Sequence, residues 1–260
     1  MAAVSKHATP AVIACAVLLL ATQALAASRK AHDDCNAEDP DRNIAGCTRI
    51  IADRGEGKRV RGIAHVGRGL AWVAKGKLDR AIADFTQAVR LNPNDALAYS
   101  NRGLTWADKG DFDRAIADYT TAIRLDPLPR SDLTGVPHVN IHHNRGIAWF
   151  KKGDLDRAFA DYDEAIRLDP VFAFAYYTRG VAWHERYTRA SAPIDKNDLN
   201  RAIADFSEAI RLDPNNTAYR RARAHAWQVN GDLERAMEDL AEVDRRLQNT
   251  PLPQLKLLMQ

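Results

Sequence analysis

Residues 68–85 read RGLAWVAKGKLDRAIADF, and related stretches recur four more times along the chain. Each copy contains one tryptophan, and the five tryptophans of the protein are Trp72, Trp106, Trp149, Trp183 and Trp227. The intervals between them are 34, 43, 34 and 44 residues. The underlying period is therefore 34 residues, with extra residues in two places. A repeat of this length predicts a fold that stacks one structural unit on the next.

Each copy predicts two helices separated by a turn. In the second segment, apolar residues recur at i, i+4, i+7 and i+8, which is one face of an α-helix; in the first copy they are Ala81, Phe85, Ala88 and Val89. In four copies a glycine breaks the chain before this segment, namely Gly76, Gly110, Gly153 and Gly231. One helix pair cannot bury such a face alone, so we expect neighbouring pairs to stack, with the tryptophans in the core.

These residues resemble the tetratricopeptide repeat (TPR) family. The family pattern of aromatic, Gly or Ala, aromatic, then Ala, aromatic, Ala and a terminal Pro is matched in most copies. The resemblance covers residues 62–248, as five units at 62–95, 96–138, 139–172, 173–216 and 217–248. The last unit departs from the pattern at Ala224 and Leu240 and lacks the proline, as expected of a terminal repeat. The resemblance implies an all-α, right-handed solenoid of antiparallel helix pairs, with a concave groove lined by the first helices.

Residues 1–26 have the layout of a secretory signal peptide. Lys6 and His7 precede an apolar run from Ala11 to Leu20, and Ala24-Leu25-Ala26 supplies a cleavage pattern of small residues. We therefore expect cleavage after Ala26 and export to the periplasm. Secretion, or retention of the segment as a membrane anchor, is the alternative. The apolar stretch is short for the roughly 30 Å of hydrocarbon in a bilayer.

The charge balance argues against nucleic acid or a membrane surface as the partner. The formal net charge is +3, and loss of Lys6 with the signal peptide leaves +2, without blocks of like charge. Proteins that bind nucleic acid or anionic lipid normally carry a stronger basic asymmetry. After cleavage of the signal peptide we therefore expect a protein or peptide partner.

The segment 27–61 contains Cys35 and Cys47, an even pair in a chain bound for an oxidising compartment. A disulfide is the natural inference, and closing this loop would contribute about 3 kcal/mol in the chain-entropy model. A zinc site is the alternative, with only His32, Asp33 and Asp34 as further ligands. Residues 41–47 align with 79–85, so we expect an N-terminal capping helix at 41–53, fastened by the disulfide and lacking a partner helix.

Two insertions and the C-terminal tail interrupt this regularity. Residues 128–138 add nine residues between the second and third units, and residues 186–198 add ten between the helices of the fourth. Each insertion could contact a partner or be a tolerated loop. In the tail, 249–260, four leucines could cover the last apolar face or remain loose: Leu252, Leu255, Leu257 and Leu258.

One arginine and one aspartate recur in every unit and predict ion pairs within the units. The arginines are Arg68, Arg102, Arg145, Arg179 and Arg223, and the aspartates are Asp84, Asp118, Asp161, Asp205 and Asp239. A second arginine four residues before each aspartate, such as Arg80, could share the acid. Because the pair recurs in each unit, we interpret it as structural, since a catalytic site would be expected once.

Residues that vary between units on the groove side are better candidates for binding. The resemblance implies that Asn101 and Asn144 occupy a position that TPR relatives use to hydrogen-bond an extended peptide backbone, and an amide offers both a donor and an acceptor. The corresponding residues of the other units are Gly67, Thr178 and Ala222, so the ladder is incomplete. The candidate binding set is Ser100, Asn101, His143, Asn144, Tyr177, Thr178, Arg221 and His225, with Phe150, His184 and Gln228 further along.

The sequence offers no motif for catalysis, cofactor binding or metal binding. Gly57-Lys58 lacks the glycine of a phosphate-binding loop, and no nucleophile elbow or zinc-protease motif is present. His138 and His142 have an i, i+4 spacing that can bind metal on a helix, but no carboxylate or cysteine accompanies them. We therefore predict a non-catalytic scaffold that binds a protein or peptide in its groove, without cofactor, metal or small-molecule substrate. The alternative is a structural or assembly factor of the cell envelope that binds through its loops or convex face.

Overall fold

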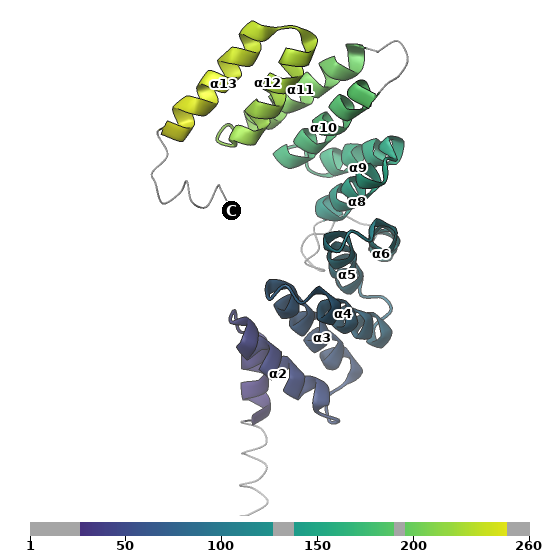
Figure 1. The fold of residues 1–260 in the computed structure, drawn as a ribbon. Coiled ribbons are helices and arrows are strands. Elements are labelled where there is room, and N and C mark those ends of the chain that lie inside the picture. The colour runs from purple at the N-terminus through teal and green to yellow at the C-terminus, as the bar shows by residue number, and fades with distance from the viewer. Residues whose placement is uncertain (1–26, 127–137, 190–195, 249–260) are drawn as a thin grey trace, which may run out of the picture. The chain divides into compact units, whose positions relative to one another are not determined.

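The computed structural model describes residues 27–126, 138–189 and 196–248, and within these ranges every regular element is a helix (Figure 1). The chain divides into two compact units, residues 1–109 and 110–260. The first contains α2 (Pro40–Ala52), α3 (Lys58–Ala74), α4 (Leu78–Leu91) and α5 (Ala96–Asp108). The second contains α6 (Phe112–Leu125), α8 (His138–Lys152), α9 (Leu155–Leu168), α10 (Ala173–Arg189), α11 (Lys196–Leu212), α12 (Thr217–Asn230) and α13 (Leu233–Gln248).

Within each unit the helices form antiparallel pairs, as in an all-α solenoid. In the pairs α3–α4, α8–α9 and α12–α13 the turn needs glycine, because Gly76, Gly153 and Gly231 have φ angles of +66°, +84° and +86°. Residues with side chains rarely adopt this left-handed conformation. In these three pairs a glycine therefore ends the first helix within a few residues of its tryptophan.

Close approach of the paired helices depends on a second glycine. A Cβ atom on Gly146 would lie 2.7 Å from the Tyr162 ring, and one on Gly180 would lie equally close to Phe206. The aromatic rings are fully buried against these glycines. Trp149 and Trp183 are partly buried and pack against the same clusters from the side. The glycine of the first helix and the aromatic ring of the second thus form one contact, which fixes how the pair packs.

The N-terminal segment corrects the expectation that the capping helix lacks a partner. Residues 27–35 are helical, and Ala31 and Cys35 pack into one buried cluster with Cys47 and Ile50 of α2. Gly46 of α2 allows this, since a Cβ there would lie 2.3 Å from the backbone nitrogen of Cys35. The partner helix lacks the tryptophan of the repeats, so the repeat pattern could not reveal it.

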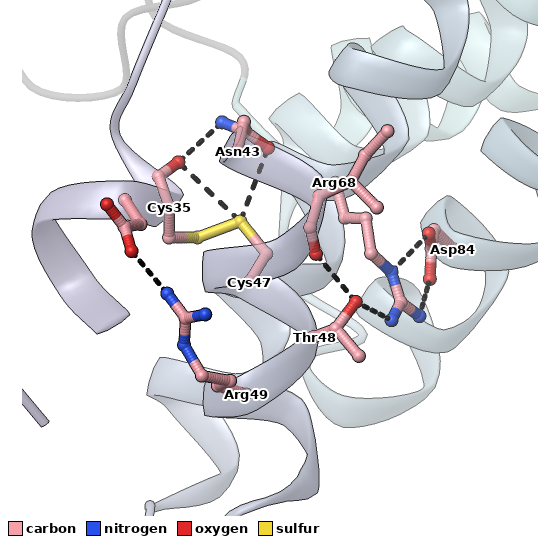
Figure 2. The surroundings of a disulfide bond; sticks show 9 residues. Cys35, Asn43, Cys47, Thr48, Arg49, Arg68 and Asp84 are labelled. Carbon is pink, nitrogen blue, oxygen red and sulfur yellow. Dashed lines mark hydrogen bonds and ion pairs between the residues drawn. A yellow bond between two sulfur atoms is a disulfide. The ribbon is translucent and has the colours of Figure 1, made fainter. Parts of the chain in front are cut away.

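The Cys35–Cys47 disulfide is present, with the Cα atoms 4.5 Å apart. The side-chain amide of Asn43 donates to the Cys35 carbonyl beside it (Figure 2). Cys47 is fully buried and takes the place that an aromatic ring occupies in the repeats. The covalent bond thus replaces the aromatic contact that holds the other helix pairs together.

The insertion at 186–198 extends two helices as well as adding residues between them. α10 continues to Arg189 and α11 begins at Lys196. Arg186 donates two hydrogen bonds to the buried Asp198, at 2.7 and 2.6 Å. Treating the whole stretch as a tolerated loop is therefore wrong, because its two ends belong to the packed helices.

Several sequence predictions lie outside the described residues. They are the signal peptide at 1–26, most of the insertion at 128–138, and the tail with its four leucines. Among the helices that the structure describes, none is both long enough and apolar enough to span a bilayer.

Candidate partner-binding surfaces

In the N-terminal unit, the first helices of two neighbouring repeats, α3 and α5, contact each other and expose aliphatic side chains. Ile63 and Leu70 of α3 are 60% and 47% exposed, and Leu104 of α5 is 43% exposed. These residues lie on the sides of the helices that do not pack into the core. The α3–α5 surface is therefore apolar and open to solvent.

Asn101 contributes a hydrogen-bond donor to this surface. Its side-chain nitrogen is shielded from solvent and has no hydrogen-bond partner in the structure. Leaving a buried donor unpaired costs about 1–3 kcal/mol, so rotation of this partly buried amide toward an acceptor on a bound chain would relieve that cost. Ser100, its neighbour in the candidate set, is partly buried.

A pocket of about 350 Å³ lies between α3 and residues 35–43. Its lining includes Gly67, Leu70 and Ala74 of α3, together with Cys35 and the segment 36–40. Gly67 stands two residues before its helix-packing glycine, the same register as Asn101. A Cβ there would lie 3.3 Å from the Cys47 sulfur, so a small residue lets the disulfide approach and forms the floor of the pocket.

In the C-terminal unit, α8 and α10 are linked by His143 and Thr178, two residues of the candidate set. The Nε2 atom of His143 lies 3.0 Å from the Thr178 hydroxyl oxygen. That hydroxyl donates to the carbonyls of Phe174 and Ala175, so the histidine must donate the proton at Nε2. The two residues therefore join the first helices of neighbouring repeats.

His143 lies beneath the surface. It is 3% exposed, and its ring packs against Tyr162, Phe172 and Phe174, with the nearest ring centres 5.1 Å away. Burial lowers its pKa to about 4, with a hydrogen bond to Asn144 opposing the shift. The imidazole is thus neutral at pH 7. In the unbound chain His143 therefore shapes the surface from beneath.

Tyr177 lies in a row of aromatic rings that continues this cluster. Its ring centre is 5.8 Å from Phe174, 6.0 Å from Phe206 and 5.0 Å from Tyr219. Phe174 is 43% exposed, so the row reaches the solvent there. Phe174 was not among the predicted surface residues, although its position at the start of the first helix is equivalent to that of the exposed Ile63.

The remaining polar members of the candidate set lie on α8, α10 and α12. His184 and His225 place their ring centres 4.9 Å apart, and the Nε2 atom of His184 is buried without a hydrogen-bond partner. Burial lowers the pKa of His184, and the electrostatic interaction with the neighbouring His225 lowers it further. Arg221 and His225 are exposed, whereas Asn144 is partly buried. The α8–α10–α12 surface is therefore aromatic with basic and polar groups beside it.

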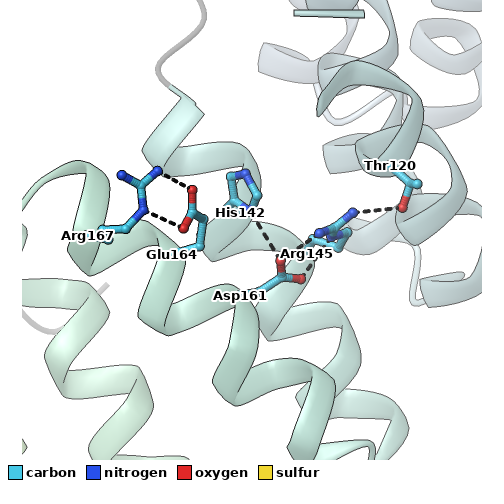
Figure 3. Close-up of polar contacts among 6 residues, drawn as sticks. All are labelled: Thr120, His142, Arg145, Asp161, Glu164 and Arg167. Atoms are coloured by element: carbon cyan, nitrogen blue, oxygen red, sulfur yellow. Dashed lines mark hydrogen bonds and ion pairs between the residues drawn. The ribbon is translucent and has the colours of Figure 1, made fainter. Parts of the chain in front are cut away.

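Four of the expected ion pairs are present within their repeats, and each arginine forms an additional hydrogen bond to the preceding repeat or helix. In Figure 3, Arg145 donates to both oxygens of Asp161, at 2.8 and 2.7 Å. Its remaining nitrogen donates to the hydroxyl of Thr120 on the preceding repeat, at 3.1 Å. His142 lies 3.2 Å from the same carboxylate, which gives this histidine a structural partner.

The same three-way contact recurs along the chain. Arg68 bonds Asp84 and also Thr48 of α2 (Figure 2). Arg179 and Arg223 bond the aspartates of their own repeats. The acceptors on the preceding helices are Thr48, Thr86, Thr120, Asp163 and Ser207. The expected fifth pair, Arg102 and Asp118, belongs to different compact units.

Four arginines of the second set pack on tryptophan rings. Arg80 lies over the Trp72 ring at 4.7 Å, and Arg157 lies over Trp149 at 3.6 Å. Arg201 and Arg235 lie over the tryptophans of their repeats in the same way. Guanidinium groups are attracted to the electron-rich faces of such rings, so these arginines cover the tryptophans.

No group of three or more potential metal ligands occurs within the described ranges. His142 is occupied by Asp161, and the side chain of His138 lies outside what the structure describes. The surfaces above therefore offer recognition chemistry in the form of apolar area, aromatic rings, amides and basic groups.

Comparison with known proteins identifies the same repeat. A sequence model of the tetratricopeptide repeat matches residues 62–128 and 187–249, and a second model of this repeat matches 139–172. A search of curated proteins found no match.

Solved structures with this fold include three at 17–18% sequence identity. MamA from Desulfovibrio magneticus RS-1 is 18% identical, with a TM-score of 0.62 over 73% of this chain and 96% of that one. A tetratricopeptide repeat protein from Parabacteroides merdae is 17% identical, with a TM-score of 0.66 over 85% and 78%. YrrB, described as a TPR protein with an unusual peptide-binding site, is 18% identical, with a TM-score of 0.57 over 77% and 91%. At these identities the likeness establishes the fold. Together with the repeat matches, which extend over more than half of the sequence, it shows that the chain belongs to the tetratricopeptide repeat family.

Proposed function

We propose that this protein is a non-catalytic adaptor that binds an extended segment of another protein along the first helices of its repeats. Proteins of this family generally serve as scaffolds, and one structural relative, YrrB, is described as having a peptide-binding site. The observation that carries the proposal is the unpaired side-chain nitrogen of Asn101. A backbone carbonyl of a bound peptide would satisfy it.

The surroundings of Asn101 favour a partner with aliphatic side chains. Leu104 and Leu70 expose apolar surface on the α3–α5 surface, and the pocket at Gly67 could accept one apolar side chain. An extended chain satisfies its backbone through groups such as Asn101, while its side chains enter pockets. On the α8–α10–α12 surface, Arg221 and His225 favour acidic side chains beside aromatic contacts. We therefore propose that the α3–α5 surface binds an apolar segment and the α8–α10–α12 surface an acidic one.

The test uses peptides selected on the protein itself. Residues 27–260 are used to select binders from a displayed random peptide library, and the affinity of each peptide is measured by titration calorimetry. We expect Asn101→Ala with Asn144→Ala to weaken binding about tenfold or more, since a backbone carbonyl of the bound peptide loses its donor. Asn94→Ala is the matched control, because Asn94 is exposed in the turn between α4 and α5.

Equal affinities for the native protein and the double variant would contradict groove binding. In that case the alternative function is tested by a pull-down from cell-envelope extract, with the native protein and the double variant as baits. A partner retained by both would favour a structural or assembly role through the loops or the convex face.

Export to the periplasm is part of the same proposal. It is supported by the layout of residues 1–26 and by the Cys35–Cys47 disulfide, because such bonds persist in oxidising compartments. An exported adaptor of this kind would act on proteins of the cell envelope.

A further inference from the structure

Two histidines interrupt an apolar pattern on the first helices of the repeats. The pattern joins the residue after one tryptophan with the residue two before the next, and both are apolar at three junctions: Val73 with Leu104, Ala107 with Ile147, and Phe150 with Val181. At the last junction the same positions hold His184 of α10 and His225 of α12. The repeat therefore does not require imidazoles here, and their presence calls for another explanation.

The two imidazole rings lie next to each other where α10 contacts α12. Their centres are 4.9 Å apart, and the ring planes are inclined by 52°. An imidazole nitrogen binds Zn²⁺ at about 2.0–2.1 Å, so two rings that share one ion in a tetrahedral arrangement have their centres about 5 Å apart. The observed separation therefore suits two ligands of one metal ion.

One nitrogen of His184 lacks the partner that its burial calls for. The Nε2 atom is shielded from solvent and has no hydrogen-bond partner, which is costly for a buried polar atom. Burial lowers the pKa of His184, and the interaction with His225 lowers it further, so the ring is neutral at pH 7. Metal ions bind this neutral form. His225 is exposed, so its ring can turn and admit an ion to the buried nitrogen.

The charges around the two rings leave room for a cation. The negative charge of Glu185 acts on His184, although Arg189 holds this carboxylate at 2.6 Å. Arg221 lies one turn before His225, but it is exposed and its charge is screened by salt. In the part of the chain that the structure describes, no third His, Cys, Asp or Glu completes a metal-binding group. The two histidines would therefore leave coordination positions open.

We propose that His184 and His225 form an open binding site for a divalent transition-metal ion of the kind that imidazole prefers, such as Zn²⁺ or Cu²⁺. The ligands come from the first helices of neighbouring repeats, so a bound ion ties α10 to α12. Its free positions are taken by water or by a side chain of a bound protein. This site goes beyond the proposed peptide binding and does not depend on it.

The test titrates residues 27–260 with Zn²⁺ alone by calorimetry and records the electron paramagnetic resonance spectrum with Cu²⁺ alone. We expect one tight Zn²⁺ per chain and a Cu²⁺ spectrum with two coordinated nitrogens. His184→Phe with His225→Val restores the apolar pair of the preceding junction, so it should fold normally and bind Zn²⁺ about tenfold more weakly or worse. Native affinity should also fall about tenfold or more from pH 7.5 to pH 5.5, because protons compete for the imidazole nitrogens.

His32→Gln is the matched control, because His32 is already paired with the carboxylate of Glu56; it should leave Zn²⁺ binding unchanged. His225→Gln should retain one of the two nitrogens in the Cu²⁺ spectrum. Equal Zn²⁺ affinities of the native protein and the double variant would overturn the proposal, since the ion would then bind elsewhere. A Cu²⁺ spectrum that is identical in the native protein and His225→Gln would overturn it as well.

Discussion

At the residue scale, the arginine of each first helix forms two contacts, and only one of them could be predicted from the sequence. The pairing of Arg145 with Asp161 could be predicted because both residues recur in every copy. The bond from Arg145 to Thr120 could not, because the acceptor varies between threonine, serine and aspartate. In the same way, the burial of His143 could not be predicted, because it depends on the aromatic rings of Phe172 and Phe174.

We expect Arg145→Ala to lower the free energy of unfolding by about 3 kcal/mol, because it leaves the 4%-exposed Asp161 without its main counter-charge. Thr120→Val removes only the bond to the preceding repeat and should cost less than about 1 kcal/mol. Urea denaturation followed by tryptophan fluorescence measures both. Lys151→Ala, at an exposed site on the same helix, is the control. Equal losses in the first two variants would mean that the aspartate is not the important partner.

His143 predicts a dependence of stability on pH. Its pKa is about 4 in the folded protein against an ordinary value of 6.5, because burial disfavours the charged form. The unfolded chain therefore binds a proton between these values that the folded protein does not. The stabilisation is complete above pH 6.5 and is lost as the pH falls to 4.

Between pH 7 and pH 4.5 we expect the free energy of unfolding to fall by about 2 kcal/mol less in His143→Gln than in the native protein. Urea denaturation at the two pH values measures this difference. His225→Gln is the control, because His225 is exposed. Parallel pH profiles for the native protein and His143→Gln would show that this histidine does not titrate as the structure requires.

At the scale of elements, the helix pairs were predictable because glycine and aromatic side chains mark both sides of each contact. A Cβ on Gly146 would overlap the Tyr162 ring, so these two residue types must occur together. The helix at 27–35 escaped prediction because it lacks the tryptophan that marks the first helix of each repeat. The ends of α10 and α11 escaped because the repeat pattern says nothing about how far an insertion continues a helix.

The N-terminal helix pair should depend on its disulfide. We expect Cys35→Ser with Cys47→Ser to destabilise residues 27–52 by about 3 kcal/mol, because the unfolded segment gains the freedom that the closed loop removes. Hydrogen exchange measured peptide by peptide gives this value, with α11 as the internal reference. Reductant should reproduce the effect in the native protein and do nothing to the double variant. Unchanged exchange at 27–52 would show that packing of Ala31 and Ile50 suffices.

At the scale of the whole molecule, the repeat period was sufficient to predict the fold class, whereas location and partner depend on segments outside the repeats. The proposed export predicts a mature chain that begins at Ala27. Mass spectrometry of the periplasmic fraction should find this N-terminus, and Ala26→Arg should block cleavage because the peptidase requires a small residue there. Ala3→Arg, which only adds charge before the apolar run, should be processed normally. A cytosolic chain that still begins with Met1 would contradict export.

The three-way arginine contact also bears on how such a chain can change its length. Every repeat brings an arginine that reaches backward, and four of its second helices bring a hydroxyl or carboxylate that receives the next one. Duplication of one complete repeat would therefore copy both the arginine of its first helix and the acceptor on its second helix that binds the next arginine. The new junction would be formed at once, without a compensating substitution in either neighbour. Gain and loss of whole repeats is thus an easier evolutionary route for this protein than insertion of an unrelated helix pair.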